Sequence, residues 1–353
     1  LYVNGGGATH LKDIYQVDAG GFIEFDAARW EVKKGRYFSF ESYVGETQAE
    51  PSSLPAMLRE AVTSRLVSDR RVGLLLSGGI DSTLILSVIC SAKLQDSVHC
   101  FIGETGRSED ALYAQQCADK LGIRANVIQL GYGGTTFERF LRICRHQEKP
   151  FPLLGNSMAM AEMYEAVAQH DVPVVLDGTG GDEVFGGYWD RYYPFAVREA
   201  FRKRDWTWLA QTARHNAGIF QRTLRDMTGA EEFGRRLLQP VVKHPSFAVR
   251  QFCAPSARAA PHGDPLVGAD LSFTDAIVAD LTRGRLGDWL WQNDRNAMMS
   301  SIENRSPLLD FRLAAFAGSG YRAKFVGPWN KHELRKSFDA FIPLPTQWRR
   351  QKQ

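Results

Sequence analysis

An unbroken apolar run that ends in a glycine-rich turn constrains the fold more than any other feature of the chain. Residues 72–76 read Val-Gly-Leu-Leu-Leu, and residues 77–82 continue as Ser-Gly-Gly-Ile-Asp-Ser. Such a run suits a strand that is buried on both faces of a parallel sheet. The two glycines end the strand, and apolar residues at helical spacing resume over residues 82–94. We therefore predict a strand, a tight loop and a helix in immediate succession.

The same alternation of apolar runs and helical patterns continues on both sides of this unit. It predicts further strands over residues 98–102, 125–130 and 172–176, and helices over residues 53–67, 108–121 and 158–169. Ser108 and Gly122 are the expected caps of the helix between them. Strands that alternate with helices at this spacing predict an α/β fold with a doubly wound parallel sheet.

The two ends of the chain have a different character. Residues 1–48 predict short extended segments over residues 13–17, 22–25 and 36–40, separated by glycine-rich turns. Residues 189–340 show long helical patterns with no convincing strand, so we predict a helical C-terminal half. Its segment 198–258 is rich in arginine, which indicates either a solvated helical surface or a field that steers an anionic substrate.

Composition excludes several classes of protein. The chain has 353 residues, of which 44% are hydrophobic and 24% charged, as in a globular protein with a real core. A net charge of +3 is small for a dedicated nucleic-acid binder, and no apolar stretch is long enough to span a membrane. The five cysteines are odd in number and widely separated, which favours reduced thiols in a cytoplasmic protein and gives no zinc-binding spacing.

The loop at residues 77–82 has the chemistry of an anion-binding site. Gly78 and Gly79 let the backbone approach an anion closely, while Ser77 and Ser82 add hydroxyls beside a helix N-terminus. Asp81 would repel a phosphate unless a divalent cation lay between them, so the loop predicts a polyphosphate bridged by magnesium. The lysine of a Walker A loop is absent. Alternatively, Asp81 has a purely structural role and caps the N-terminus of the helix that follows the tight turn.

A second glycine-rich turn, which carries the adjacent carboxylates Asp182 and Glu183, follows the predicted strand 172–176. Residues 177–188 read Asp-Gly-Thr-Gly-Gly-Asp-Glu-Val-Phe-Gly-Gly-Tyr. Open α/β sheets bind ligands at the carboxyl ends of their strands, so Asp81 and Asp182 could hold one magnesium ion together. Alternatively, this segment is a helix start with solvated acidic residues.

These motifs resemble those of a known family. Residues 77–82 match the SGGxDS loop of the ATP-pyrophosphatase (PP-loop) families, and residues 178–188 resemble the GxGxDExFGGY signature of the asparagine synthetase family. Residues 294–310 are similar to its DRxxM…ExRxPFLD block, and residues 331–335 to its KxxLR helix. The chain thus resembles the synthetase domain of glutamine-hydrolysing asparagine synthetases over nearly its whole length. The resemblance implies an adenine nucleotide alpha-hydrolase-like fold over residues 49–353.

The resemblance also implies a reaction. A substrate carboxylate attacks the α-phosphate of ATP to give an acyl-adenylate and magnesium pyrophosphate, and ammonia then displaces AMP to form an amide. Carried over by position, the nucleotide- and pyrophosphate-binding residues are Leu76, Ser77, Gly78, Gly79, Asp81, Ser82, Gly103 and Gly178, with Asp81 and Asp182 on Mg2+. Lys331 and Glu303 are the expected catalytic residues, and Thr179 and Arg305 lie next to the substrate. A buried ion pair that shapes the site is an equal alternative for Glu303 and Arg305.

Two departures from the family pattern bear on the substrates. Thr179 stands where aspartate-using members carry a glutamate. The acceptor is therefore either aspartate or another carboxylate, such as a uronic acid or a specialised metabolite. The second alternative includes enzymes that form a cyclic amide. No cysteine precedes Cys90, although residues 1–48 resemble the end of a glutaminase domain and its linker. We expect ammonia from a glutaminase domain, upstream in the same chain or separate. The resemblance to this family is also compatible with an oligomeric protein. A hypothesis from another class is a nucleotide-binding protein without catalytic activity.

Overall fold

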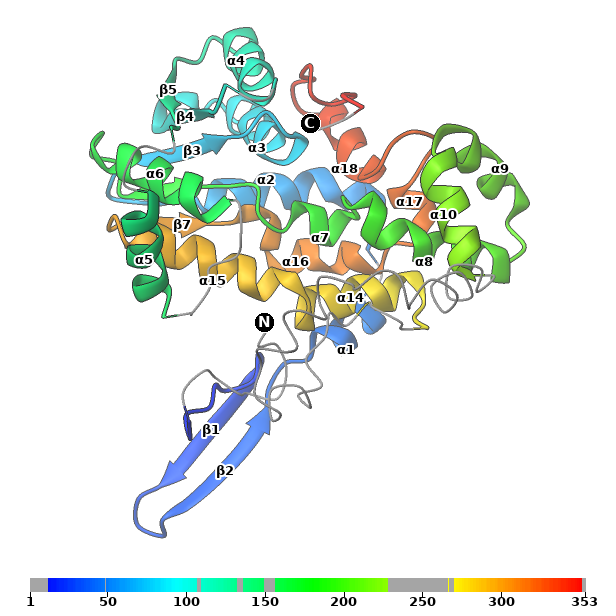
Figure 1. Cartoon of the computed structure of the whole chain (residues 1–353), viewed down its shortest axis with the longest axis horizontal. Helices are drawn as coiled ribbons and strands as arrows, with labels where there is room; N and C mark the ends of the chain where they lie inside the picture. The colour runs from blue at the N-terminus through cyan, green and yellow to red at the C-terminus, as the bar shows by residue number, and fades with distance from the viewer. Residues whose placement is uncertain are drawn as a thin grey trace, which may run out of the picture.

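A five-stranded parallel sheet organises the first half of the chain in the computed structural model, and its strands lie on the left in Figure 1. The structure describes residues 12–47, 49–106, 109–131, 136–148, 156–227, 266 and 270–350. The strands of the sheet are β3 (Val72–Leu76), β4 (Val98–Glu104), β5 (Ala125–Gln129), β6 (Val174–Leu176) and β7 (Glu303–Arg305). Their order is β5-β4-β3-β6-β7, and every neighbouring pair is parallel. The direction of strand addition therefore reverses between β3 and β6, as in a doubly wound sheet.

Helices alternate with the strands in the first half and dominate the second. The first half contains α1 (Phe40–Glu46), α2 (Leu54–Ser64), α3 (Ile80–Ser91), α4 (Asp110–Lys120), α5 (Thr136–Gln147), α6 (Asn156–Ala168) and α7 (Gly181–Phe185). The second half contains α8 (Trp189–Arg202), α9 (Trp206–His215), α10 (Ala217–Met227), α14 (Phe273–Arg283), α15 (Arg285–Met298), α16 (Phe311–Ala314), α17 (Tyr321–Lys324) and α18 (His332–Ser337). The predicted α/β class is confirmed, and the helix boundaries agree within a few residues. Ser108 lies outside the described residues, whereas Gly122 follows α4 with φ +67°.

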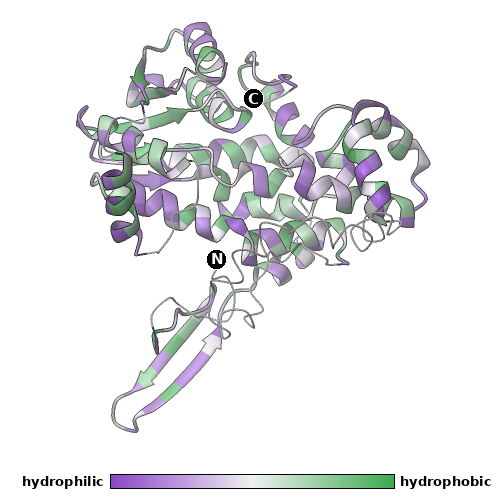
Figure 2. Ribbon diagram, viewed as in Figure 1, coloured by the Kyte–Doolittle hydropathy of each residue, from purple (hydrophilic) through white to green (hydrophobic). Residues whose placement is uncertain are grey.

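The central strand β3 is buried on both faces, as its apolar sequence predicts (Figure 2). Leu74 and Leu76 pack into a cluster with the buried face of α3. Leu75 points to the opposite cluster, which contains Phe101 and Tyr164. Because successive strand side chains alternate between faces, each strand contributes to both cores. The edge of the sheet where these strands end is thus held rigidly from two sides.

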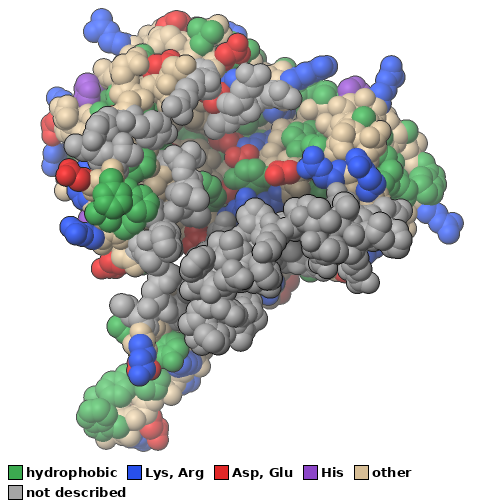
Figure 3. All heavy atoms as spheres, viewed as in Figure 1, with side chains coloured by type: hydrophobic (Ala, Val, Ile, Leu, Met, Phe, Trp, Pro, Cys, Tyr) green, Lys and Arg blue, Asp and Glu red, His purple; other side chains and the backbone are tan. Residues whose placement is uncertain are grey.

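The N-terminal prediction is partly wrong. Strands β1 (Gly21–Asp26) and β2 (Glu31–Arg36) form an antiparallel hairpin that projects from the body. Strand β2 ends at Arg36, the residue at which the predicted strand 36–40 was expected to begin. Ser39 accepts a hydrogen bond from Ser42 N and starts α1 at the next residue. The predicted strand 13–17 contains only an isolated bridge. Both hairpin strands are largely exposed, and hydrophobic side chains gather at the far end of the hairpin (Figure 3).

One strand of the main sheet comes from the half that was predicted to be entirely helical. Strand β7 pairs with β6, and its backbone bonds extend beyond the strands, from Glu303 N to Pro173 O and from Asp177 N to Arg305 O. Its residues are Glu, Asn and Arg, so neither apolar character nor β-branching marks it as a strand. The pairing is therefore set by tertiary context rather than by local sequence.

The helical half has its own core around α8. Tyr192, Tyr193, Phe273 and Phe325 are buried there together, and Trp208 donates a hydrogen bond from Nε1 to the backbone O of Phe325 at 2.8 Å. Residues 228–258 of the arginine-rich segment lie outside the described residues. None of the helices that the structure describes is long and apolar enough to cross a membrane.

Candidate functional site

Residues Ser77–Ser82, which comprise the turn after β3 and the first residues of α3, are called the phosphate loop here. Ser77 N donates to Ser82 Oγ at 3.1 Å, and the hydroxyls of the two serines lie 3.3 Å apart. Gly78 has φ +68°, and a Cβ at this position would overlap the backbone oxygen of Asp110 at the start of α4. Only glycine combines this backbone conformation with such a close approach. The sequence prediction of a tight turn before a helix is confirmed.

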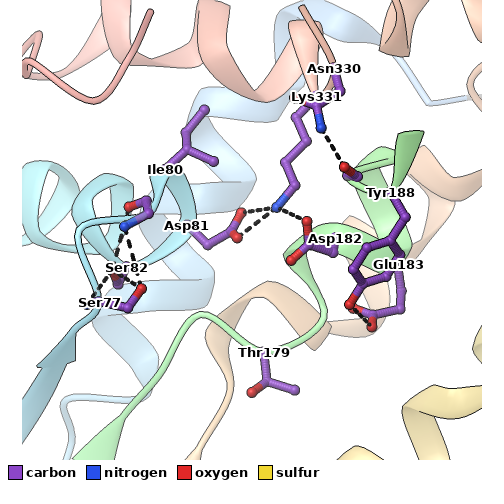
Figure 4. A network of polar contacts seen from close by, with 12 residues as sticks. Ser77, Ile80, Asp81, Ser82, Thr179, Asp182, Glu183, Tyr188, Asn330 and Lys331 are labelled. Carbon is purple, nitrogen blue, oxygen red and sulfur yellow. Dashed lines mark hydrogen bonds and ion pairs between the residues drawn. The ribbon is translucent and has the colours of Figure 1, made fainter. Parts of the chain in front are cut away.

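Three charged side chains meet between the phosphate loop and the turn after β6 (Figure 4). Lys331 Nζ donates to Asp81 Oδ1 and Oδ2 at 2.8 and 2.6 Å, and it lies 2.7 Å from Asp182 Oδ1. We call these three residues the ion triad. Lys331 is 3% exposed. Burial lowers the pKa of Lys331, but Asp182 and Asp81 outweigh it and raise the pKa above its usual value, so the ammonium stays charged.

The ion triad lies where the sheet topology predicts a ligand site. Asp81 follows β3 and Asp182 follows β6, the two strands between which the direction of addition reverses. Lys331 comes from just before α18 and has φ +49°, a left-handed conformation that is rare outside glycine. Close packing positions the carboxylates, because a Cβ at Gly181 would overlap the carboxylate of Asp81. The structure thus brings together three residues predicted from separate motifs.

The expected nucleotide-binding residues lie along the same edge. Leu76 is the last residue of β3 and pairs with Ile102, so Gly103 lies one residue further along the neighbouring strand. Leu74 pairs with Leu176, which places Gly178 just beyond the end of β6. These positions come from three adjacent strands, and they bring backbone groups to one side of the phosphate loop.

Glu183 is a buried carboxylate beside the ion triad that the sequence analysis did not single out. It is 3% exposed and accepts a hydrogen bond from the Tyr188 hydroxyl at 2.9 Å. Burial, together with the neighbouring Asp182 charge, raises the pKa of Glu183 to about 7. The acid that follows Asp182 in the motif is therefore poised to change charge near neutral pH.

This raised pKa predicts a pH-dependent loss of stability. Below the ordinary carboxyl pKa of about 4.5, Glu183 is protonated in both the folded and the unfolded chain. Between that value and 7 the unfolded chain releases the proton and the folded chain keeps it, so the folded state loses up to roughly 3 kcal/mol as pH rises. We expect Glu183→Gln, followed by urea unfolding from pH 5 to 8, to gain stability relative to the unsubstituted chain as pH increases. Glu31→Gln on the exposed hairpin is the control; a pH-independent difference for Glu183→Gln would contradict the prediction.

Thr179 does not point toward the ion triad. Its hydroxyl donates to Asp177 Oδ2 at 2.8 Å and accepts from Asn293 Nδ2 at 2.9 Å. Figure 4 shows its side chain directed away from Lys331. Asp177 also accepts hydrogen bonds from Asn304 Nδ2 and Ser306 Oγ, both at 2.9 Å. Asp177 therefore anchors this turn to β7 and α15, a role that sequence reasoning missed because the partners come from distant segments.

Glu303 and Arg305 lie apart from the ion triad. Both are on β7, where Arg305 Nε donates to Glu303 Oε1 at 2.7 Å. Arg305 Nη1 also donates to the backbone oxygens of Arg65 and Val67, at 2.7 and 2.8 Å. Glu303 pairs with Val174 at the beginning of β6, whereas the ion triad lies beyond its end. The contacts thus match the ion-pair alternative, although the Glu303 side chain is 57% exposed rather than buried.

A cleft of about 480 Å³ opens over this edge of the sheet. The charged groups of Lys, Arg, Asp and Glu that line it are Asp81, Asp182, Lys331, Arg335, Arg349 and Arg350. The cations outnumber the carboxylates, so the lining suits a polyanion such as a polyphosphate. Figure 3 shows a hollow in this face of the molecule, with acidic and basic side chains at its floor. Trp189, Ile219 and Pro328 add apolar surface to the cleft.

The ligands that a magnesium ion would need are present only in part. Among the described residues, no group of three or more His, Cys, Asp and Glu side chains could hold a metal ion by itself. Magnesium is commonly bound by one or two carboxylates together with substrate phosphates. Asp81 and Asp182, which face the same point from two strand ends, fit that donor set.

Comparisons with known proteins agree with the motifs. A family model described as asparagine synthase matches residues 53–353. Amidase chry2 of Gibberella zeae is 22% identical, with 95% of this chain and 57% of the relative covered. A glutamine-hydrolyzing asparagine synthetase 2 of Bacillus subtilis is 24% identical, with 96% and 45% covered. The chain spans about half the length of these curated relatives.

Among solved structures, an NH3-dependent NAD synthetase from Campylobacter jejuni matches 39% of this chain and 61% of its own. The sequence identity is 18% and the TM-score 0.28.

Proposed function

Because the chain belongs to the asparagine synthase family, we propose that it is an ATP-dependent ligase that forms an amide through an acyl-adenylate. In this reaction a carboxylate oxygen bonds to the α-phosphorus of ATP, and the bond to pyrophosphate breaks. Ammonia then attacks the acyl carbon, AMP leaves, and a proton is released from the nitrogen. The observation that carries the proposal is the ion triad at the end of the phosphate loop.

The residues have separate roles in this scheme. Ser77, Ser82 and the backbone of the phosphate loop bind the phosphates to be released, next to the N-terminus of α3. Asp81 and Asp182 would hold Mg2+, which when bound neutralises charge on the phosphates. Lys331 aims a buried ammonium at the charge that develops during transfer, and such a fixed cation is effective in a site that excludes water.

The acceptor is a carboxylate, and the surroundings of Thr179 bear on which one. Aspartate has an ammonium group that needs a partner, and the Thr179 hydroxyl is already engaged by Asp177 and Asn293. This observation favours the second candidate, amidation or amide-forming cyclisation of a carboxylate other than aspartate. Two relatives with the printed name amidase, from Gibberella zeae and Penicillium rubens, agree loosely with that candidate.

We further propose that residues 1–48 are the end of a glutaminase-like domain and its linker, and that residues 49–353 are the synthetase domain. The β1–β2 hairpin supports this division, because its two strands pair with each other and, within the part of the chain that the structure describes, lie outside the main sheet. Glutamine would then supply the ammonia through such a domain. A cytoplasmic location is kept as part of this proposal, because the odd number and wide spacing of the five cysteines favour reduced thiols.

The test is release of AMP and pyrophosphate from ATP and Mg2+, with ammonium chloride as the nitrogen source, in the presence and absence of aspartate. Release that requires aspartate and yields asparagine would identify asparagine synthesis. Release only with another carboxylate, from a panel of sugar acids and amino-acid derivatives, would identify the second candidate. Binding of ATP without any release would overturn the proposed ligase activity and leave a nucleotide-binding protein.

Asp81→Asn tests the proposed metal contact. The amide is a weaker ligand for magnesium than the carboxylate and cannot pair ionically with Lys331. We expect the magnesium concentration for half-maximal ATP use to rise by about tenfold or more, the equivalent of roughly 1.4 kcal/mol. A magnesium titration of AMP formation measures it, with Asp119→Asn on the outer side of α4 as the control. An unchanged magnesium dependence would remove Asp81 from the metal site.

A further inference from the structure

The segment Leu344–Arg350 near the C-terminus packs directly against the phosphate loop and the helix that follows it. The hydroxyls of Thr346 and Thr83 are 2.7 Å apart, and Thr346 is 1% exposed. Gln347, which is 3% exposed, donates through Nε2 to the backbone O of Arg335 and to Asp339 Oδ1. These contacts fix the backbone of the segment before it reaches Arg349.

Arg349 makes three contacts that join the phosphate loop to α4. Its Nη1 donates to the backbone oxygen of Gly78 at 3.1 Å and lies 2.7 Å from Asp110 Oδ1. Its guanidinium lies over the Tyr113 ring, 3.9 Å from the centroid. The side chain is only 9% exposed, although it carries a charge at the edge of the cleft. One planar guanidinium thus bridges the loop to the first turn of α4.

The contact with Gly78 determines which way the next amide points. In a trans peptide the C=O of one residue and the N–H of the following residue point in opposite directions. Arg349 holds the Gly78 oxygen toward α4, so the Gly79 N–H is directed to the other side. Gly79 N donates a hydrogen bond to Ser77 Oγ at 3.4 Å, so this N–H points toward the hydroxyls of the phosphate loop. Successive N–H groups that point into one concavity form an anion-binding nest.

Arg335 connects the same segment to the ion triad. Its Nη1 donates to Gln347 O at 2.6 Å and to Arg349 O at 3.3 Å, while its Nε donates to Asn330 O at 2.8 Å. Asn330 immediately precedes Lys331. The backbone on which Arg349 lies and the backbone that presents Lys331 are therefore held by one buried side chain, which is 6% exposed.

We propose that Arg349 is a positioning residue for nucleotide binding: it sets the Gly78–Gly79 peptide so that the Gly79 amide faces the bound phosphates. The inference rests on the proposed function, since it concerns the loop that would bind ATP. Arg349 acts through the loop and through Asp110, and its charge is already paired with that carboxylate. This separates it from an arginine that binds phosphate directly.

The test compares Arg349→Lys and Asp110→Asn by equilibrium binding of MgATP to the 353-residue chain, without any acceptor. Lysine keeps the charge but loses the planar group that reaches Gly78 O and Asp110 together. We expect each variant to weaken binding by about tenfold, as for the loss of a hydrogen bond to a charged group. Arg312→Lys is the matched control, because Arg312 also pairs with an aspartate and lies near an aromatic ring, away from the cleft.

Asp110→Asn distinguishes positioning from direct binding. If Arg349 bound phosphate directly, removal of the neighbouring negative charge would leave MgATP binding unchanged or tighten it. Weaker binding of MgATP in both variants supports the proposal. Unchanged or tighter binding in Asp110→Asn overturns it, and so does unchanged binding in Arg349→Lys. In turnover the KM for ATP should rise by about the same factor while kcat stays within about twofold, because Lys331 keeps its place. If the unsubstituted chain bound no MgATP, the proposed function itself would fail.

Discussion

Replacement of Lys331 by alanine is expected to abolish AMP formation. A pre-organised group aimed at developing charge typically contributes about 10²–10³ in rate, and Lys331 is the cation closest to both carboxylates of the site. The substitution also leaves Asp81 and Asp182 facing each other without the ammonium. We therefore expect a loss of thermal stability at low magnesium in addition to the loss of activity. AMP release and thermal unfolding, both measured with and without MgATP, would separate the two effects.

Lys336→Ala is the matched control, because it removes an exposed lysine from the same short helix. Lys331→Gln supplies a second variant, which keeps most of the side-chain length and can donate hydrogen bonds to the two carboxylates. If Lys331→Gln folds like the unsubstituted chain and still forms AMP at the full rate, Lys331 has no part in the chemistry. If Lys331→Gln folds like the unsubstituted chain but forms no AMP, the result would support a role for the lysine in the chemistry.

A single methyl group at Gly78 is expected to have an effect almost as large. Alanine at φ +68° costs about 1 kcal/mol in backbone strain, and its Cβ would overlap the carbonyl oxygen of Asp110. That oxygen belongs to the first turn of α4, so neither partner can rotate away as a flexible side chain would. The loop must shift, and misplacement by about 1 Å can cost roughly 10²-fold in rate. We expect that loss in ATP turnover for Gly78→Ala, with weaker binding of MgATP.

Gly106 provides the control for backbone strain alone. It has φ +67°, and a Cβ there would meet nothing within 4 Å. Gly106→Ala should therefore lose a similar amount of stability to strain and keep its activity. Equal losses of activity in the two variants would show that strain, and not the contact of the phosphate loop with α4, explains the effect.

Local sequence predicts the strands that are apolar and buried, and it fails where a strand is polar. Residues 72–76 form a strand at the predicted bounds because burial on both faces requires an unbroken apolar run. Glu303–Arg305 has no such signal, since it is an edge strand of three polar residues that is set by backbone bonds to β6. The start of α1 at Phe40 depends on a cap at Ser39, which replaced the extended segment expected there.

Local sequence also predicts some residues of the site and misses others. Asp81, Asp182 and Lys331 lie in motifs that mark them individually, and the sheet topology explains why they meet. Asp177 and Arg349 carry no such mark, because their importance comes from partners that lie far away in the sequence. Glu303 stands in a family motif, yet its carboxylate pairs with Arg305 on β7 instead of with the ion triad. Whether it contacts a bound substrate stays a prediction.

The origin of β7 affects how the chain reaches its folded state. Strand β6 is buried along its whole length, and the partner on its outer side is residues 303–305, which are synthesised long after it. Until those residues emerge, β6 presents an apolar, unpaired edge of the kind that recruits strands from other molecules. Pairing across so long a stretch of chain is also intrinsically slow. Nascent chains that stall or are cleaved before Glu303 should therefore aggregate, and would depend on chaperones for their solubility.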